Sequence, residues 1–145
     1  MLTNNQISYL PYDDYAQSAN TLFHFMKKQE YLNSILRRRA IIPRFPGKPD
    51  IVLPKYKAVV FVNGCFWHGH TDCRYFVWPK NNSEFWREKI IGNIARDQKN
   101  YELLRDLGWN VFVIWECELK RSVIEKTLDS LINDIKQGLQ SATNL

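Results

Sequence analysis

Between residues 65 and 117 the chain carries four side chains that can bind a soft metal ion: Cys65, His70, Cys73 and Cys117. The first three follow the spacing C-x4-H-x2-C, and the fourth comes just after a predicted strand. Three thiolates and one imidazole match the closed tetrahedral set of a structural zinc site, whereas a catalytic zinc ion keeps one position open for water. The pattern therefore predicts a structural Zn²⁺ site that fastens a long loop to the end of that strand.

Two alternatives to this ligand set stay open on spacing alone. The three cysteines could be buried reduced thiols with an unrelated histidine, since three cysteines cannot all pair within one chain. His68 could replace His70, because C-x2-H is also a common local loop. We favour His70.

A carboxylate and a second imidazole suggest hydrolytic chemistry. Asp50 begins a predicted strand, and the partner strand leads within a few residues to His68. A carboxylate that holds a divalent cation, beside an imidazole that accepts a proton from water, is a minimal site for phosphodiester hydrolysis. The alternative for Asp50 is a turn-forming residue at the strand start.

Asp97 adds to this pair because it falls on the apolar face of a predicted helix. A carboxylate in such a place needs a partner, and the candidates are His68 or a bound cation. A structural ion pair with Arg96 or Arg105 is the competing interpretation.

Three aromatic residues, Phe66, Trp67 and Trp86, form another set. Rings in such places are usually core residues. However, few residues of a tight metal loop can turn inward, and exposed rings beside a cation such as Lys89 could wedge between base pairs.

The elements that must position these groups can be read from periodicity and turn signals. Residues 1–20 are expected to form an irregular arm, and Gly108 to end a helix that Ser83 caps. The expected elements are a helix or broken helix pair over 18–39, a connector over 45–49, a β-hairpin of 50–53 and 58–62, a loop over 63–82, a helix over 83–107, a buried strand over 109–115 and an amphipathic helix over 123–139. This order predicts a small α/β sheet covered by helices, with 58–62 as its buried central strand.

The composition agrees with a single domain over residues 1–145. A content of 45% apolar and 24% charged residues excludes a disordered or fibrous chain. No apolar run approaches the roughly 20 residues of a membrane span and no signal peptide is recognisable, so we expect a cytoplasmic protein. Twenty Lys and Arg against fifteen Asp and Glu give a net charge of +5, which suits a polyanionic partner.

Several ordered motifs closely resemble the very short patch repair endonucleases, the DNA mismatch nicking enzymes. The resemblance covers about residues 46–119, which we treat as the motif-bearing core. It rests on PGKPDIV at 46–52, NGCFWHGH at 63–70, FW at 85–86, RD at 96–97, GW at 108–109 and WECE at 115–118.

The resemblance implies a restriction-endonuclease-like fold with a structural zinc site. It also implies Mg²⁺-dependent nicking 5′ to the thymine of a T:G mismatch, the product of 5-methylcytosine deamination. In this sequence Asp50 would be the Mg²⁺ ligand, His68 the general acid/base and Asp97 its partner. Cys65, His70, Cys73 and Cys117 would bind zinc, Phe66, Trp67 and Trp86 would enter the duplex as a wedge, and Lys89 and Asn93 would lie near the bases or backbone.

The sequence departs from the family pattern at three places. Asn63 stands where some members carry a second histidine, and Thr71-Asp72 lengthens the metal loop by one residue. The early helix of the family supplies a glutamate, whereas the apolar positions here align Gln29 with it and leave Glu30 one residue away.

We therefore predict a monomeric Mg²⁺-dependent endonuclease that acts on double-stranded DNA with a T:G mismatch. Asp50 and the Val62 carbonyl would hold the Mg²⁺ ion, and Glu30 is included among the candidate catalytic residues. One rival is a restriction or homing nuclease of other specificity. The other is a zinc-stabilised DNA-binding module that has lost catalysis.

Overall fold

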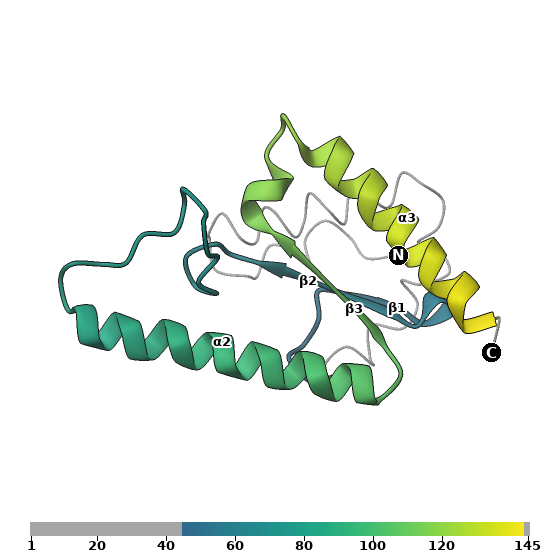
Figure 1. Cartoon of the computed structure of the whole chain (residues 1–145), viewed down its shortest axis with the longest axis horizontal. Helices are drawn as coiled ribbons and strands as arrows, with labels where there is room; N and C mark the ends of the chain where they lie inside the picture. The colour runs from purple at the N-terminus through teal and green to yellow at the C-terminus, as the bar shows by residue number, and fades with distance from the viewer. Residues whose placement is uncertain (1–44, 144–145) are drawn as a thin grey trace, which may run out of the picture.

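The computed structural model describes residues 45–143. The expected arm over 1–20, the helix over 18–39 and Glu30 lie outside the described residues. Within them, two strands joined by a 3₁₀ turn are followed by a long loop, a helix, a strand, a second 3₁₀ turn and a last helix (Figure 1). The elements are β1 (Ile51–Leu53), η3 (Pro54–Tyr56), β2 (Ala58–Asn63), α2 (Ser83–Asp106), β3 (Asn110–Trp115), η4 (Glu116–Leu119) and α3 (Ile124–Thr143).

The three strands form one mixed sheet in the order β1-β2-β3. β1 pairs antiparallel with β2, as expected for the hairpin, and β2 pairs parallel with β3. Every residue of β2 is buried, which confirms the prediction of a central strand that is apolar on both faces.

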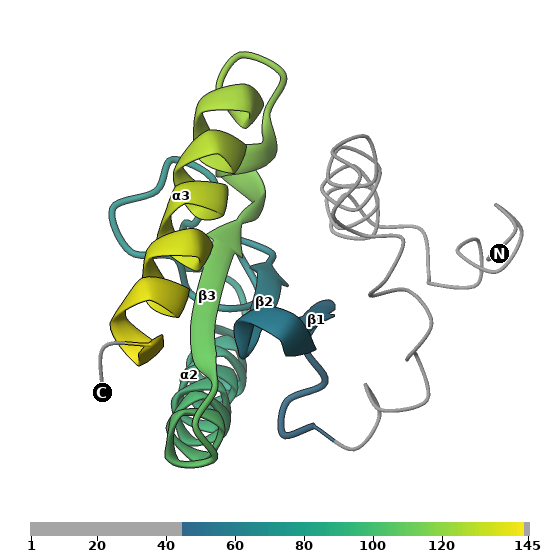
Figure 2. The same ribbon diagram turned by 90° about the vertical axis from the view of Figure 1, so that its right-hand side faces the viewer.

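The two helices cover opposite faces of this sheet (Figures 1 and 2). Side chains alternate along a strand, so Val60 and Val62 pack with Leu128 on the face covered by α3. Val59 and Phe61 pack with Leu104 on the face covered by α2. The result is the small helix-covered α/β sheet that the sequence predicts.

The α2 helix is longer than the sheet it covers. Its first half extends beyond the sheet beside the 63–82 loop (Figure 1), and most of its side chains there are exposed. Because Ile90 and Asn93 are buried, the loop has to pack against this half of the helix. The 63–82 loop and the first half of α2, which carry most of the predicted functional residues, therefore pack against each other.

Three local expectations are wrong. Only Ile114 of β3 is buried, because β3 lies at an edge of the described sheet rather than inside it. Ser83 is the first residue of α2 rather than its cap, and Asn82 precedes it with no side-chain capping bond. Val123 lies before α3 and is 41% exposed, so it does not belong to the apolar stripe of that helix.

Within residues 45–143, no helix combines the length and apolar character that crossing a bilayer requires.

Candidate metal centre and active site

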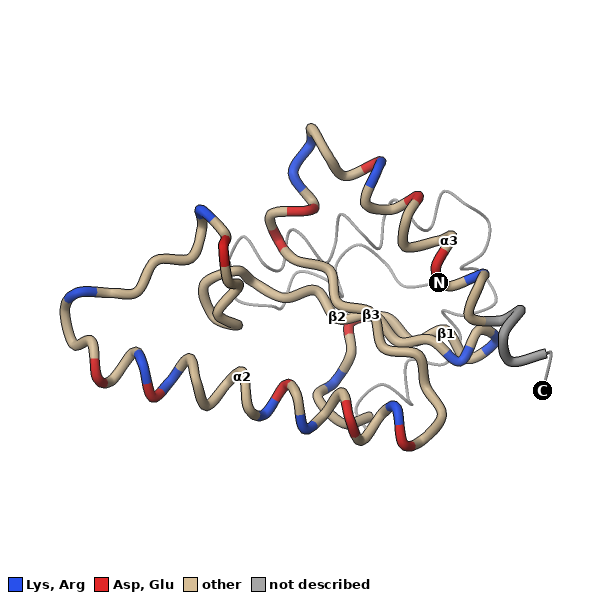
Figure 3. Tube along the Cα trace, in the orientation of Figure 1, with Lys and Arg blue, Asp and Glu red and all other residues tan. Residues whose placement is uncertain are grey.

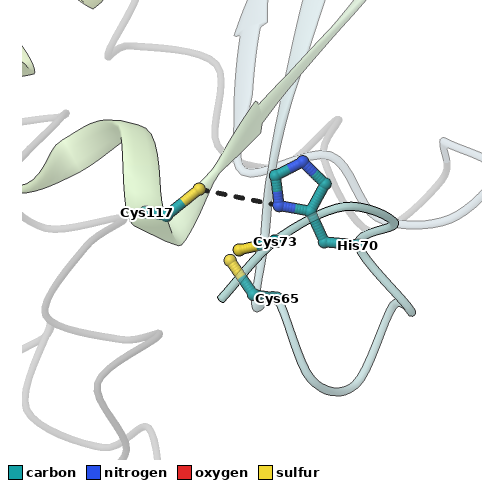
Figure 4. Close-up of side chains that lie close together, drawn as sticks. All are labelled: Cys65, His70, Cys73 and Cys117. Atoms are coloured by element: carbon teal, nitrogen blue, oxygen red, sulfur yellow. Dashed lines mark hydrogen bonds between the residues drawn. The ribbon is translucent and has the colours of Figure 1, made fainter. Parts of the chain in front are cut away.

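The three cysteines and His70 converge at the carboxyl end of the sheet (Figure 4). Their candidate ligand atoms all lie within 4.8 Å of one another. Parallel strands place their carboxyl ends at the same edge, and Asn63 pairs with Trp115 across β2 and β3. Cys65 and Cys117 each come two residues after that pair, so strand register explains why a cysteine distant in sequence joins the loop ligands.

Short contacts hold the loop around this cluster. The His70 N–H donates to the Cys65 carbonyl oxygen at 2.9 Å, which closes the 65–70 turn. The Cys65 N–H donates to a carboxylate oxygen of Glu116 at 3.3 Å, which ties the loop to η4. Because Nδ1 of His70 lies 3.6 Å from Sγ of Cys117, the imidazole presents that nitrogen to the cysteines.

The arrangement fits one tetrahedral cation. Metal–sulfur and metal–nitrogen distances of about 2.0–2.3 Å keep ligand atoms of one ion within about 4.5 Å of each other, close to the spread seen here. Burial raises the pKa of the Cys65 thiol to about 12 and also raises the pKa of Cys117, so a metal ion would have to displace protons from neutral thiols. The convergence argues against three unrelated thiols, and it selects His70 rather than His68.

Asp50 lies against the end of β2. Its backbone N–H donates to the Val60 carbonyl oxygen at 3.0 Å, and its carboxylate accepts the Val62 N–H at 2.7 Å. The half-buried Asp50 carboxylate is therefore held beside Val62, whose carbonyl we predicted as a second Mg²⁺ ligand.

His68 and Asp97 are in direct contact. Nδ1 of His68 lies 2.5 Å from Oδ2 of Asp97, and the two side chains are 24% and 18% exposed. Arg96, one of the alternative partners of Asp97, instead donates to the Asn93 side-chain oxygen at 2.6 Å. The loop and the helix thus bring together the imidazole and carboxylate that the sequence predicts as a pair.

A buried pair that the sequence analysis missed lies beside these groups. The Asn63 side-chain amide donates to the Tyr101 hydroxyl oxygen at 2.8 Å. The pKa of Tyr101 is raised to about 12, mainly by burial. The nearby carboxylates of Asp97 and Asp50 add to this rise, and the hydrogen bond from Asn63 opposes it. Tyr101 lies four residues after Asp97 on the same helix face, which is the only sequence signal of its place near the site.

Phe66, Trp67 and Trp86 form a cluster of three rings in mutual contact. Ring centroids of Phe66 and Trp67 are 5.4 Å apart, and those of Trp67 and Trp86 are 5.8 Å apart. Trp67 is 44% exposed, whereas Phe66 and Trp86 are half-buried. The cluster therefore projects one ring into solvent and supports it with two others.

The backbone of this loop is pressed onto α2. Gly69 has a φ of +61°, and an added Cβ would come within 2.7 Å of the Ile94 side chain. The Asn93 amide donates to the Trp67 carbonyl oxygen at 2.9 Å. Both polar atoms of the buried Asn93 side chain therefore form hydrogen bonds within the protein, because its oxygen accepts a bond from Arg96. Lys89, one helical turn earlier, is exposed.

Comparison with known proteins connects this arrangement to one enzyme family. The family model of the DNA mismatch endonuclease Vsr matches residues 22–74. The type II nicking enzyme V.NmeAIP of Neisseria meningitidis is 50% identical over 97 residues, which are 66% of this chain and 69% of that protein.

Two further relatives agree. The DNA mismatch endonuclease Vsr of Escherichia coli is 43% identical over 61% of this chain and 55% of its own length. The type II nicking enzyme V.XorIIP of Xanthomonas oryzae is 51% identical over 51% of this chain and 54% of its own length, so the chain matches about half the length of these two. These matches show that the chain belongs to the Vsr family of DNA mismatch endonucleases.

Proposed function

We propose that this protein is a Mg²⁺-dependent DNA endonuclease that nicks one strand of a duplex 5′ to the thymine of a T:G mismatch. The observation that carries the proposal is the 2.5 Å contact between His68 and Asp97, formed next to the exposed Trp67 on the same loop. Because His68 directly follows Trp67, the same loop would both locate a mismatched base pair and present the imidazole that acts on the DNA backbone.

His68 would act as the general base. With Nδ1–H donated to the Asp97 carboxylate, the other ring nitrogen is left to accept a proton from the attacking water. The Asp97 carboxylate would hold the imidazole in this tautomer and stabilise the imidazolium that forms. This assignment gives each member of the pair one role in the same proton transfer.

The Asp50 carboxylate and the Val62 carbonyl would hold Mg²⁺, which prefers oxygen ligands. When bound, the cation neutralises charge on the scissile phosphate and assists the leaving 3′-oxygen. The Val62 N–H bond to the Asp50 carboxylate orients that group toward the end of β2. The sheet itself thereby positions the proposed ligand.

The three-ring cluster would read the mismatch. A ring inserted between base pairs must pay for unstacking, which costs a few kcal/mol per step and least at a mismatch. Asn93, which holds the Trp67 backbone, would set the angle of the wedge rather than contact bases directly. Four exposed cations on the loop and the first turns of α2 suit contacts to phosphates, namely Arg74, Lys80, Arg87 and Lys89. Acidic residues lie among them along the chain (Figure 3), so these contacts would be local rather than one large basic face.

We also propose that Cys65, His70, Cys73 and Cys117 bind a structural Zn²⁺ ion and that the sheet belongs to a restriction-endonuclease-like core. The donor set of three thiolates and one imidazole supports zinc, and it leaves no position for a catalytic water.

Strand-resolved cleavage of end-labelled duplexes tests the proposed function. The panel contains T:G, T:A, C:G and the other mismatches in one flanking sequence, each with Mg²⁺ or with EDTA. We expect one nick, in the thymine strand of the T:G duplex, only with Mg²⁺. Cleavage of matched duplexes in both strands would identify a restriction-type nuclease, and binding without cleavage would identify a DNA-binding module.

A further inference from the structure

Asn63 and Tyr101 form a buried hydrogen bond that joins β2 to α2. The Asn63 amide donates to the Tyr101 hydroxyl oxygen at 2.8 Å, and the two residues are only 4% and 6% exposed. Neither side chain has a role in the chemistry proposed above.

The bond lies close to the backbone segments that position the two proposed catalytic carboxylates, Asp50 and Asp97. Asn63 directly follows Val62, whose N–H holds the Asp50 carboxylate. Tyr101 lies one helical turn after Asp97, on the same face of α2. The hydrogen bond thus connects the strand that holds Asp50 to the helix that carries Asp97.

The chemistry of the pair makes it a specific connection. The Tyr101 ring packs against Phe61, with centroids 4.9 Å apart, and belongs to the apolar cluster between α2 and the sheet. A phenylalanine could fill this space, so the hydroxyl is not required for packing. A buried amide and a buried hydroxyl are costly when they lack hydrogen-bond partners, and a shift of α2 along or about its axis would separate these two.

We infer that Asn63 and Tyr101 are positioning residues that fix the distance between the Asp50 carboxylate and the His68–Asp97 pair. This inference rests on the proposed function, because it assigns these groups to one reaction. Misplacement of reacting groups by about 1 Å can cost on the order of 10²-fold in rate, so a single lost bond between β2 and α2 has a measurable consequence. Substrate binding should be affected much less, since the wedge is held by separate contacts at Gly69 and Asn93.

Four variants test the inference: Tyr101→Phe, Asn63→Ala, the double variant, and Tyr56→Phe as the matched control. Tyr56 is also a buried tyrosine, but it packs in the cluster on the α3 side of the sheet. Single-turnover nicking rates on the T:G duplex are measured at saturating enzyme and Mg²⁺, well below the melting temperature of each variant. The Kd for the same duplex is measured by fluorescence anisotropy in Ca²⁺.

We expect Tyr101→Phe to lower the nicking rate about 10- to 100-fold while Kd stays within about twofold of wild type. The double variant should be no slower than the slower single variant, because both changes remove the same bond. Tyr56→Phe should nick at nearly the wild-type rate.

The inference is overturned if Tyr101→Phe nicks like wild type, if Tyr56→Phe is equally slow, or if the two single losses multiply in the double variant. A wild-type protein that nicks none of the duplexes overturns the proposed function, and this inference with it. If the wild-type protein nicks the T:G duplex and Tyr101→Phe nicks it at the same rate, the inference alone is overturned.

Discussion

The Trp115 ring stacks on the His70 imidazole, with centroids 4.0 Å apart and planes only 1° from parallel. Trp115 is the last residue of β3, and Cys117 follows two residues later. The strand that leads to one cysteine of the Cys₃His cluster therefore also orients the histidine of that cluster.

This stack predicts that Trp115→Leu weakens zinc binding although no ligand is removed. Outer residues that orient metal ligands typically contribute 10- to 100-fold in affinity, so we expect a loss of about that size. Competition with a chromophoric chelator measures it. The control is Trp109→Leu, which changes a β3-flanking tryptophan that contacts Phe45 instead of His70; equal weakening by both substitutions would show that His70 orientation is not the cause.

Removal of a ligand should have a much larger effect. We expect one zinc ion per chain, and Cys117→Ser should lose it and unfold or aggregate, because structural zinc contributes roughly 10–16 kcal/mol of apparent binding energy to folding. Elemental analysis and thermal melting with and without a chelator check both points. Thr71→Ala is the control, since Thr71 is an exposed non-ligand in the same loop. Less than about half an equivalent of zinc in freshly purified protein would contradict the assignment.

If the three-ring cluster enters the duplex as a wedge, Trp67→Ala should selectively weaken binding to mismatched DNA. Affinity for the T:G duplex should fall more than affinity for the matched duplex, because the inserted ring gains most where stacking is already weak. Competition binding with the two duplexes gives the ratio. Trp78→Ala provides a matched exposed tryptophan on the same loop, outside the three-ring cluster; a Trp67→Ala variant that loses both affinities equally would indicate a packing role for Trp67.

Asp97→Asn should slow nicking less than His68→Ala does. The amide keeps the shape of the side chain and can still hydrogen-bond His68, but it no longer stabilises an imidazolium. Single-turnover rates compare the two variants. An Asp97→Asn rate as low as that of His68→Ala would mean that the negative charge, rather than orientation, supplies most of the effect.

Two substitutions, Glu30→Gln and Gln29→Ala, test which residue takes the place of the glutamate that the family carries in its early helix. A large loss of nicking in Glu30→Gln would show that the family glutamate is present in a shifted register. An unchanged rate would support the alignment of Gln29 to that position.

Elements whose periodicity is strong could be predicted from the sequence. The apolar run at 58–62 and the stripe of Leu128, Leu131 and Ile135 specify a buried strand and a helix face, and both are confirmed. The sequence predicts that Cys117 joins Cys65, His70 and Cys73, because three thiolates and one imidazole make a complete ligand set. The structure brings the four together, and the parallel register of β2 and β3 explains how.

What the sequence could not predict depends on how elements dock. The bond between Asn63 and Tyr101 exists only because α2 packs on β2 at one particular position, and no local pattern specifies that position. The spacing favours His70 as the ligand but also allows His68. The fold of the loop is what separates the imidazole that faces Asp97 from the one that faces the cysteines.

The most direct test of the proposed function is the single-turnover nicking rate of His68→Ala on the T:G duplex with Mg²⁺, measured beside its duplex affinity. General acid/base groups typically contribute 10²–10⁴-fold, so we predict a rate lowered by roughly that factor with mismatch affinity near wild type. Asp50→Ala should show the same separation of rate from binding. A His68→Ala variant that nicks at the wild-type rate would contradict the assignment of this imidazole as the group that moves the proton.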